Sequence, residues 1–153
     1  MYNRILVPLD GSATARRGLI EALSLAADRK STLCLLHVIN DFPLMMEMSD
    51  VIDFETYRHE LRNYGQKLLD EAAQSCAALG IPTETHLHDL RGGRVADAIV
   101  QEARDLGCQL IVIGTHGRRG VRRALLGSDA ESVMRESTLP VLLVRAEARP
   151  DRS

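Results

Sequence analysis

Residues 109–117 read Gln-Leu-Ile-Val-Ile-Gly-Thr-His-Gly, an aliphatic run that passes into a turn rich in glycine. A short apolar run bounded by turn residues predicts a buried strand, here over 109–114. Gly114 and Gly117 lack a Cβ, so we expect the backbone to pass close to a ligand and to present its amide hydrogens. This stretch therefore predicts a buried strand that leads into an anion-binding loop.

The second half of this loop is Gly127-Ser128, which follows Gly117 after nine further residues. It opens a helix predicted over 128–137, and the free amide hydrogens at a helix start favour an anion. The Ser128 hydroxyl can donate to a phosphate oxygen. An alternative is structural: Ser128 and Glu131 also fit the S-x-x-E capping box. Spacing alone leaves both interpretations open.

Working outward, the rest of the chain alternates between aliphatic runs and segments with helical spacing. Because strands and helices alternate strictly, we predict an α/β fold, with one parallel sheet and helices on both faces. The segment 82–89 is polar and begins with a proline, which favours an edge strand. The predicted strands are 5–9, 33–39, 82–89, 109–114 and 140–144, and the predicted helices are about 12–29, 54–79, 95–106 and 128–137.

Length and composition limit the possible classes. A chain of 153 residues with a net charge of −2 suits one domain without general attraction to nucleic acid or anionic membrane. Three cysteines without a CxxC pattern predict buried, reduced thiols, and we find no signal peptide and no membrane-spanning run. We expect a cytoplasmic protein with one domain over 1–146 and a polar tail over 147–153.

In open parallel sheets, ligands bind beyond the carboxyl ends of the strands, where the strand order reverses. This rule selects the segments that directly follow the predicted strands. They are Asp10-Gly11-Ser12, Ile39-Asn40-Asp41, His88-Asp89 and the residues from Gly114 onward.

Three blocks of the chain together resemble the universal stress protein family. The pattern G-x-x-G, nine residues and G-S matches the nucleotide-binding motif of that family, and the blocks 5–12, 110–117 and 140–145 resemble its first, fourth and last strands. The resemblance implies a single-domain, five-stranded parallel sheet in the order 3-2-1-4-5, similar to the adenine nucleotide alpha hydrolases. Strands one and four would then be neighbours, so Asp10 and the Gly114 loop would face one crevice.

The resemblance also implies a site, because the ATP-binding branch of the family holds ATP in this crevice. Asp10 would lie near the ribose and phosphates, and the backbone at Val38 would meet the adenine edge. Mg²⁺ or Mn²⁺ would bind through the phosphates rather than in a protein cage. The residues expected to bind ATP, or AMP or ADP, are Pro8, Leu9, Asp10, Val38, Gly114, Thr115, His116, Gly117, Arg118, Gly127, Ser128 and Asp129.

Asp129 departs from the family pattern, in which an uncharged residue is common at this position. A carboxylate near a triphosphate repels it, although the dipole favours an aspartate in the first turn of a helix. Asp129 could point to solvent, bind Mg²⁺, or bias the site toward a less charged nucleotide such as AMP.

Other polar residues have weaker interpretations. Arg118, Arg119, Arg122 and Arg123 form a basic loop, of which Arg118 is the first candidate for a phosphate contact. His86 and His88 share one face of a strand, but no third metal ligand is evident, so we expect them on a solvent-facing edge strand. The methionines at 45, 46 and 48 are expected to pack under a loop.

Three functions fit these features. The first is a nucleotide-dependent regulatory module of the stress response, the second a slow ATPase, and the third a dimeric scaffold with a vestigial site. We expect the first, with no catalytic residue, because no group is evident with a partner that would orient water at the γ-phosphate. The Walker A and G-x-G-x-x-G patterns are both absent. The resemblance implies a homodimer through the last strand, Pro140–Val144.

Overall fold

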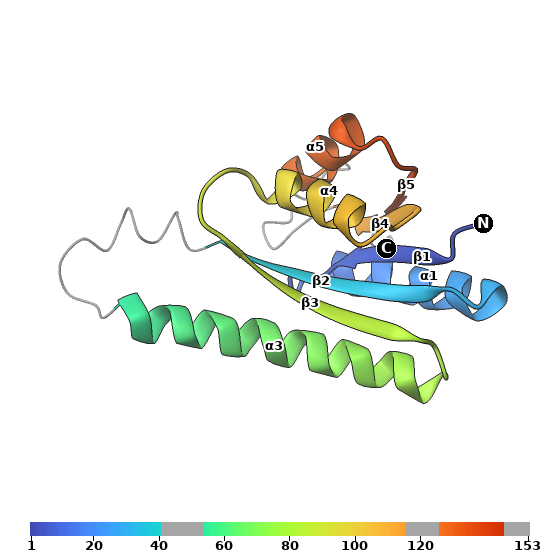
Figure 1. Cartoon of the computed structure of the whole chain (residues 1–153), viewed down its shortest axis with the longest axis horizontal. Helices are drawn as coiled ribbons and strands as arrows, with labels where there is room; N and C mark the ends of the chain where they lie inside the picture. Colours follow the sequence, from blue (N-terminus) through green and yellow to red (C-terminus); the bar gives the residue numbers. More distant parts are fainter. Residues whose placement is uncertain (41–53, 116–125, 146–153) are drawn as a thin grey trace, which may run out of the picture.

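The five predicted strands lie side by side in one parallel sheet. The computed structural model describes residues 1–40, 54–115 and 126–145 (Figure 1). Neighbouring strands pair in parallel, in the order β3-β2-β1-β4-β5. This confirms the α/β fold class, the strand order implied by the family resemblance, and the edge position of the polar strand. The strands are β1 (Arg4–Pro8), β2 (Thr32–Asn40), β3 (Thr83–Leu90), β4 (Leu110–Gly114) and β5 (Val141–Val144).

Helices cover both faces of this sheet, as Figure 1 shows with α4 and α5 on one side and α3 on the other. Helices α1 and α3 share one buried apolar cluster with the sheet, and α4 and α5 share the second. The described helices are α1 (Ala13–Arg29), α3 (Phe54–Ala78), α4 (Val95–Asp105) and α5 (Ser128–Glu136). None of them is long and apolar enough to cross a membrane.

Burial on both faces explains why the central strands are continuous aliphatic runs. Ile5 and Val7 of β1 point into the cluster under α1 and α3, whereas Leu6 points into the cluster under α4 and α5. All three are fully buried. The cysteines at 34, 76 and 108 are buried free thiols, which confirms that prediction.

Helix α1 begins where the sequence pattern places it. Ser12 is its N-cap, and the Ser12 hydroxyl accepts a hydrogen bond from the amide of Ala15 at 3.1 Å. A cap of this kind satisfies one of the free amide groups of the first turn. The carboxylate of Asp10 accepts the amide hydrogen of Ser12 at 2.9 Å. The turn between β1 and α1 is therefore fixed by two side-chain hydrogen bonds.

The buried face of α3 includes a glycine, whereas the aromatic residue beside it in the sequence is exposed. Tyr64 is 40% exposed, whereas Gly65 and Leu69 are buried. A Cβ on Gly65 would lie 2.5 Å from Cδ2 of His37 and 2.8 Å from Cδ1 of Leu87. Helix α3 lies close to the sheet at Gly65. Apolar spacing in the sequence does not predict this contact, because glycine is not among the apolar residues that define a helix face.

Strand β5 is the outer strand beyond β4, so one side of its backbone faces away from the sheet. Leu142 is 38% exposed on this strand. The edge agrees in position with the predicted dimer interface, Pro140–Val144. Dimerisation itself stays a prediction.

Candidate functional site

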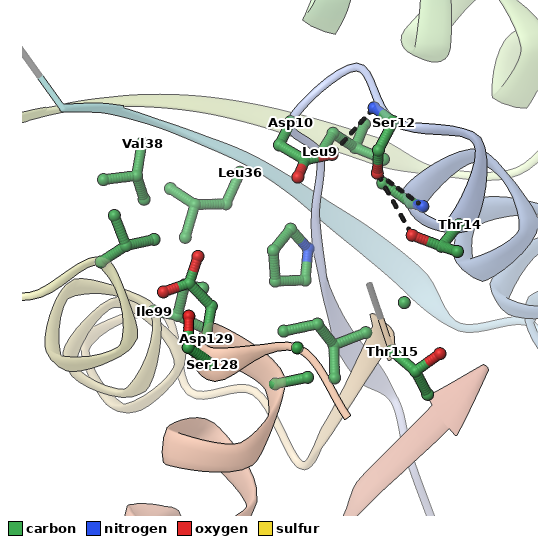
Figure 2. A pocket seen from close by; sticks show the side chains of 17 residues that line it. Leu9, Asp10, Ser12, Thr14, Leu36, Val38, Ile99, Thr115, Ser128 and Asp129 are labelled. Atoms are coloured by element: carbon green, nitrogen blue, oxygen red, sulfur yellow. Dashed lines mark hydrogen bonds between the residues drawn. The ribbon is translucent and has the colours of Figure 1, made fainter. Parts of the chain in front are cut away.

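A cavity of about 310 Å³ opens at the carboxyl ends of β1, β2 and β4 (Figure 2). Strands β1 and β4 are neighbours at this point, so the cavity lies where the strand order reverses. Every predicted site residue that the structure describes lines it. The lining residues are Pro8, Leu9, Asp10, Ser12, Thr14, Ala15, Leu36, Val38, Val95, Ile99, Ile113, Gly114, Thr115, Gly127, Ser128, Asp129 and Ala130.

One half of the cavity is apolar. Leu36 and Val38 alternate along β2, and Val95 and Ile99 lie one turn apart on α4, so each pair shares a face. Of these four, only Val38 was expected from the sequence. The spacing shows which residues share a face of α4, but it does not show that this face covers the end of β2. An apolar slot of this kind suits a flat ring system.

The other half is polar and is built around two chain segments that meet. The turn Asp10-Gly11-Ser12 contributes the Asp10 carboxylate and the Ser12 hydroxyl, and α1 contributes the Thr14 hydroxyl; the two hydroxyl oxygens lie 3.3 Å apart. Opposite this turn lies the start of α5 (Figure 2). These are the two segments that the strand order was expected to bring together.

Helix α5 begins without a side-chain cap. Its N-cap is Gly127, which has no side chain that could cap the helix, and Ser128 is the first helical residue. The capping-box alternative is therefore wrong, and the Glu131 carboxylate instead pairs with Arg135 at 2.7 Å. The amides of Ser128, Asp129 and Ala130 occupy the first turn, where helix geometry supplies no partner. Three amide hydrogens and one hydroxyl are therefore placed at the cavity.

Gly114 lines the cavity and also lies at a close contact between two backbones. A Cβ at this position would lie 2.6 Å from the carbonyl carbon and oxygen of Thr14. The glycine thus allows the end of β4 to pack against the first turn of α1. This contact sets the width of the cavity on that side.

Thr115 connects β4 to the rest of the site. Its amide donates to the carbonyl oxygen of Val144 at 2.9 Å, and its own carbonyl oxygen accepts the amide hydrogen of Gly127. Its hydroxyl is buried and has no hydrogen-bond partner among the described residues. The hydrogen bond from the Gly127 amide to the Thr115 carbonyl joins the residue after β4 to the residue before α5. The start of α5 is therefore fixed to the end of β4.

Asp129 lies at the mouth of the cavity, and Figure 2 shows its carboxylate directed inward. Partial burial and the negative charge of Asp10 raise the pKa of the Asp129 carboxyl above its ordinary value. Asp10 and Asp129 are the only charged residues among the described part of the lining. The described lining therefore carries a charge of −2 when both are ionised.

Other residues selected from the sequence are either outside the described residues or away from the cavity. His116, Gly117, Arg118 and the remaining arginines of the basic loop, like the methionine cluster, fall outside the described residues. His88 and Asp89 do not line the cavity: His88 contacts Glu102 at 2.8 Å, and Asp89 pairs with Arg62. Strand β3 is at the far edge of the sheet from β4, which separates its end from the cavity.

The face of β3 that carries His86 is half-buried, which corrects the expectation of a solvent-facing pair. His86 Nε2 lies 3.3 Å from Glu84, and Cys34 of β2 lies 3.8 Å from the same carboxylate. These three groups could hold a metal ion by distance alone. However, the Arg4 guanidinium lies 2.7 Å from Glu84 and 3.3 Å from Cys34. The positive charge of Arg4 therefore already occupies the place that a metal ion would take beside Glu84 and Cys34.

A second cavity, of about 260 Å³, lies between α1 and α3. It shares Leu9, Ser12 and Ala15 with the first but is otherwise on the opposite face of the β1–α1 turn. Its charged lining residues are Arg16 and Glu71. Of the predicted site residues that the structure describes, only Leu9 lies there.

Comparisons with known proteins agree with this architecture. The model of the universal stress protein family matches residues 1–145. Universal stress protein YxiE of Bacillus subtilis is 32% identical over 151 residues, which cover 95% of this chain and 100% of YxiE. Universal stress protein MJ0577 of Methanocaldococcus jannaschii has a solved structure similar to this chain, with a TM-score of 0.85, 27% identity and coverage of 97% and 99%. The universal stress protein from Archaeoglobus fulgidus, solved in complex with dAMP, is similar with a TM-score of 0.65, 25% identity and coverage of 94% and 98%.

Proposed function

Because this chain belongs to the universal stress protein family, we propose that it binds an adenine nucleotide in the cavity between β1, β4 and α5. The observation that carries the proposal is the arrangement of this cavity. An apolar slot over β2 and α4 adjoins a polar end where the uncapped start of α5 offers amide hydrogens. A base fits the first part and a phosphate fits the second.

The family relationship supports the choice of adenine. The relative from Archaeoglobus fulgidus was solved with dAMP, and it covers nearly the whole of this chain. In the proposed pose, the base lies against Val38 and Ile99, and the ribose passes Asp10. The phosphates meet the first turn of α5, with Ser128 as a donor.

We propose a regulatory binding module rather than an ATPase. Hydrolysis needs a group that orients water at the γ-phosphate. The Asp10 carboxylate is engaged with the amide of Ser12, where it shapes the turn. A bound nucleotide would change the charge and shape of the surface between α5 and the β1–α1 turn, and a partner protein can recognise a change of this kind.

A divalent cation, Mg²⁺ or Mn²⁺, would accompany a bound di- or triphosphate. Carboxylate and phosphate oxygens are the ligands that such cations prefer. Asp10 and Asp129 are the described lining residues that could contribute an oxygen. The phosphates would hold the rest of the coordination shell together with water.

Calorimetric titration with AMP, ADP and ATP, each with and without Mg²⁺, tests this proposal. Val38→Trp fills the apolar slot and should weaken binding of every adenine nucleotide at least about tenfold, since the slot would no longer admit the base. Ile20→Trp is the matched control, because Ile20 is 45% exposed on α1 and lies outside the lining. Heat of binding absent for all nucleotides, or unchanged in Val38→Trp, would contradict the proposal.

A further inference from the structure

We propose that Asp129 makes this site select adenine nucleotides with few negative charges, such as AMP, over cation-free ATP. The inference rests on the proposed function, because it concerns the ligand of the same cavity. It starts from Asp129, one of the two charged residues in the described lining of the cavity.

Asp129 lies at the start of α5, beside the polar end of the cavity. It is the second residue of α5, directly after Ser128, at the point where the amide hydrogens of the first turn face the cavity. Figure 2 shows its carboxylate directed into the space that the Asp10 carboxylate enters from the β1 side. Both carboxylates would therefore lie beside a bound ribose and phosphate.

The positive and negative charges at this end of the cavity differ in size. The start of a helix is equivalent to about half of a positive charge. The Asp129 carboxylate places a full negative charge at the same end of α5, and Asp10 adds another from the facing turn. Among the described lining residues, the net field at the polar end is therefore negative. This end tolerates one phosphate held by amide hydrogens, but each further phosphate adds repulsion.

No described neighbour compensates for this charge. The lining residues that β2 and α4 contribute are all apolar: Leu36, Val38, Val95 and Ile99. On α5 itself, Arg135 pairs with Glu131. The raised pKa of Asp129, caused by partial burial and by Asp10, agrees with two carboxylates that act on each other. The arginines at 118–123 lie outside the described residues, so the test compares variants that all retain them.

The test is calorimetric titration in EDTA with adenosine, AMP, ADP and ATP. In the unaltered protein, affinity should fall from AMP to ADP to ATP. Asp129→Asn removes the charge and keeps the shape, and it should raise ATP affinity about tenfold, or about 1.4 kcal/mol. AMP affinity should rise less, and adenosine affinity should stay within about twofold, because adenosine carries no phosphate charge.

A matched control separates this effect from a change in the helix itself. Glu131→Gln removes one negative charge from the same first turn of α5, but Glu131 does not line the cavity. It should leave the order of affinities unchanged. Asp129→Ser is a second neutral variant that keeps a residue suited to a helix start, and thermal unfolding checks that all variants fold.

Mg²⁺ gives a second readout. The cation neutralises phosphate charge, so it should increase ATP affinity more in the unaltered protein than in Asp129→Asn. Equal gains for all four ligands in Asp129→Asn, or no gain for ATP, would overturn the selectivity proposal while leaving nucleotide binding intact. Tighter binding of ATP than of AMP by the unaltered protein in EDTA would do the same. Failure of every ligand to bind would overturn both proposals.

Discussion

The Nδ1 atom of His37 lies 2.7 Å from the carbonyl oxygen of Leu9, so a buried imidazole on β2 holds the end of β1. Leu9 also donates its amide hydrogen to the carbonyl of Leu36 at 2.7 Å. Asp10 follows directly, so the position of its carboxylate depends on these two bonds. His37 in turn packs edge-on against Tyr64 and beside Gly65 of α3. His37 therefore connects helix α3 to the end of β1 beside the first cavity.

Replacing His37 with leucine should weaken AMP binding about three- to tenfold and destabilise the fold by about 1–3 kcal/mol, because the Leu9 carbonyl loses a buried donor. His37→Asn retains a side-chain N–H near the position of Nδ1 and should recover part of the affinity. Calorimetry with AMP and chemical unfolding measure the two effects. Lost stability in His37→Leu with unchanged affinity would mean that His37 does not position Leu9 and Asp10.

The contact between Gly114 and Thr14 predicts opposite effects for two glycine substitutions. Gly114→Ala places a Cβ 2.6 Å from backbone atoms of Thr14 and should destabilise the fold by about 1–3 kcal/mol. Gly18→Ala faces the same junction from α1, but its Cβ would lie 3.5 Å from the amide nitrogen of Gly114, an ordinary contact. Because alanine favours a helix, this variant should be more stable by about 0.5–1 kcal/mol.

Urea unfolding of both variants measures these differences, and AMP titration checks the cavity. Gly114→Ala should also bind AMP more weakly, since α1 and β4 form adjoining walls of the cavity. Equal stability of the two variants would show that the backbone at this junction relaxes freely.

The ion pair between Arg4 and Glu84 predicts a pH dependence of stability. Arg4 donates two hydrogen bonds to the carboxylate, at 2.9 Å and 2.7 Å, and holds the pKa of Glu84 at about 2. A carboxyl group with a lowered pKa in the folded state stabilises the fold above its unfolded pKa, and this contribution is lost as the pH falls. The loss should therefore occur between about pH 4.5 and pH 2.

Both side chains are partly exposed, at 32% and 41%, so we expect a contribution of about 1 kcal/mol or less. Glu84→Gln should be less stable than the unaltered protein at pH 7, and the difference should vanish near pH 2. Arg4→Lys should also lose stability at pH 7, because lysine cannot form the paired hydrogen bonds of a guanidinium. Chemical unfolding across this pH range measures the effect, and a constant difference at every pH would rule out the Glu84 charge as its source.

Much of the fold follows from the sequence because each central strand is buried on both faces. Aliphatic runs such as Ile5–Leu9 have few alternatives in a small domain, and the alternation with helices requires parallel strands. The order of the strands came from the resemblance to a family, since no pattern within a strand specifies its neighbours.

The details that sequence patterns missed depend on contacts between distant segments. Gly65 lies on the buried face of α3 because His37 and Leu87 leave no room for a Cβ, and Gly114 is constrained by the backbone of Thr14. Val95 and Ile99 line the cavity because α4 crosses the end of β2. The start of α5 was ambiguous for a related reason: Ser128 fits a capping box in sequence, but the helix takes Gly127 as its N-cap.

The most direct test of the account is NMR titration of isotopically labelled protein with AMP, followed at assigned backbone amides. Binding in the proposed cavity should shift the amide resonances of Val38, Thr115 and Ala130. The amide resonances of Glu71 and Ser75, which line the cavity between α1 and α3, should not shift. Shifts confined to that second cavity, or none at high AMP concentration, would contradict the central claim that the site between β1, β4 and α5 binds an adenine nucleotide.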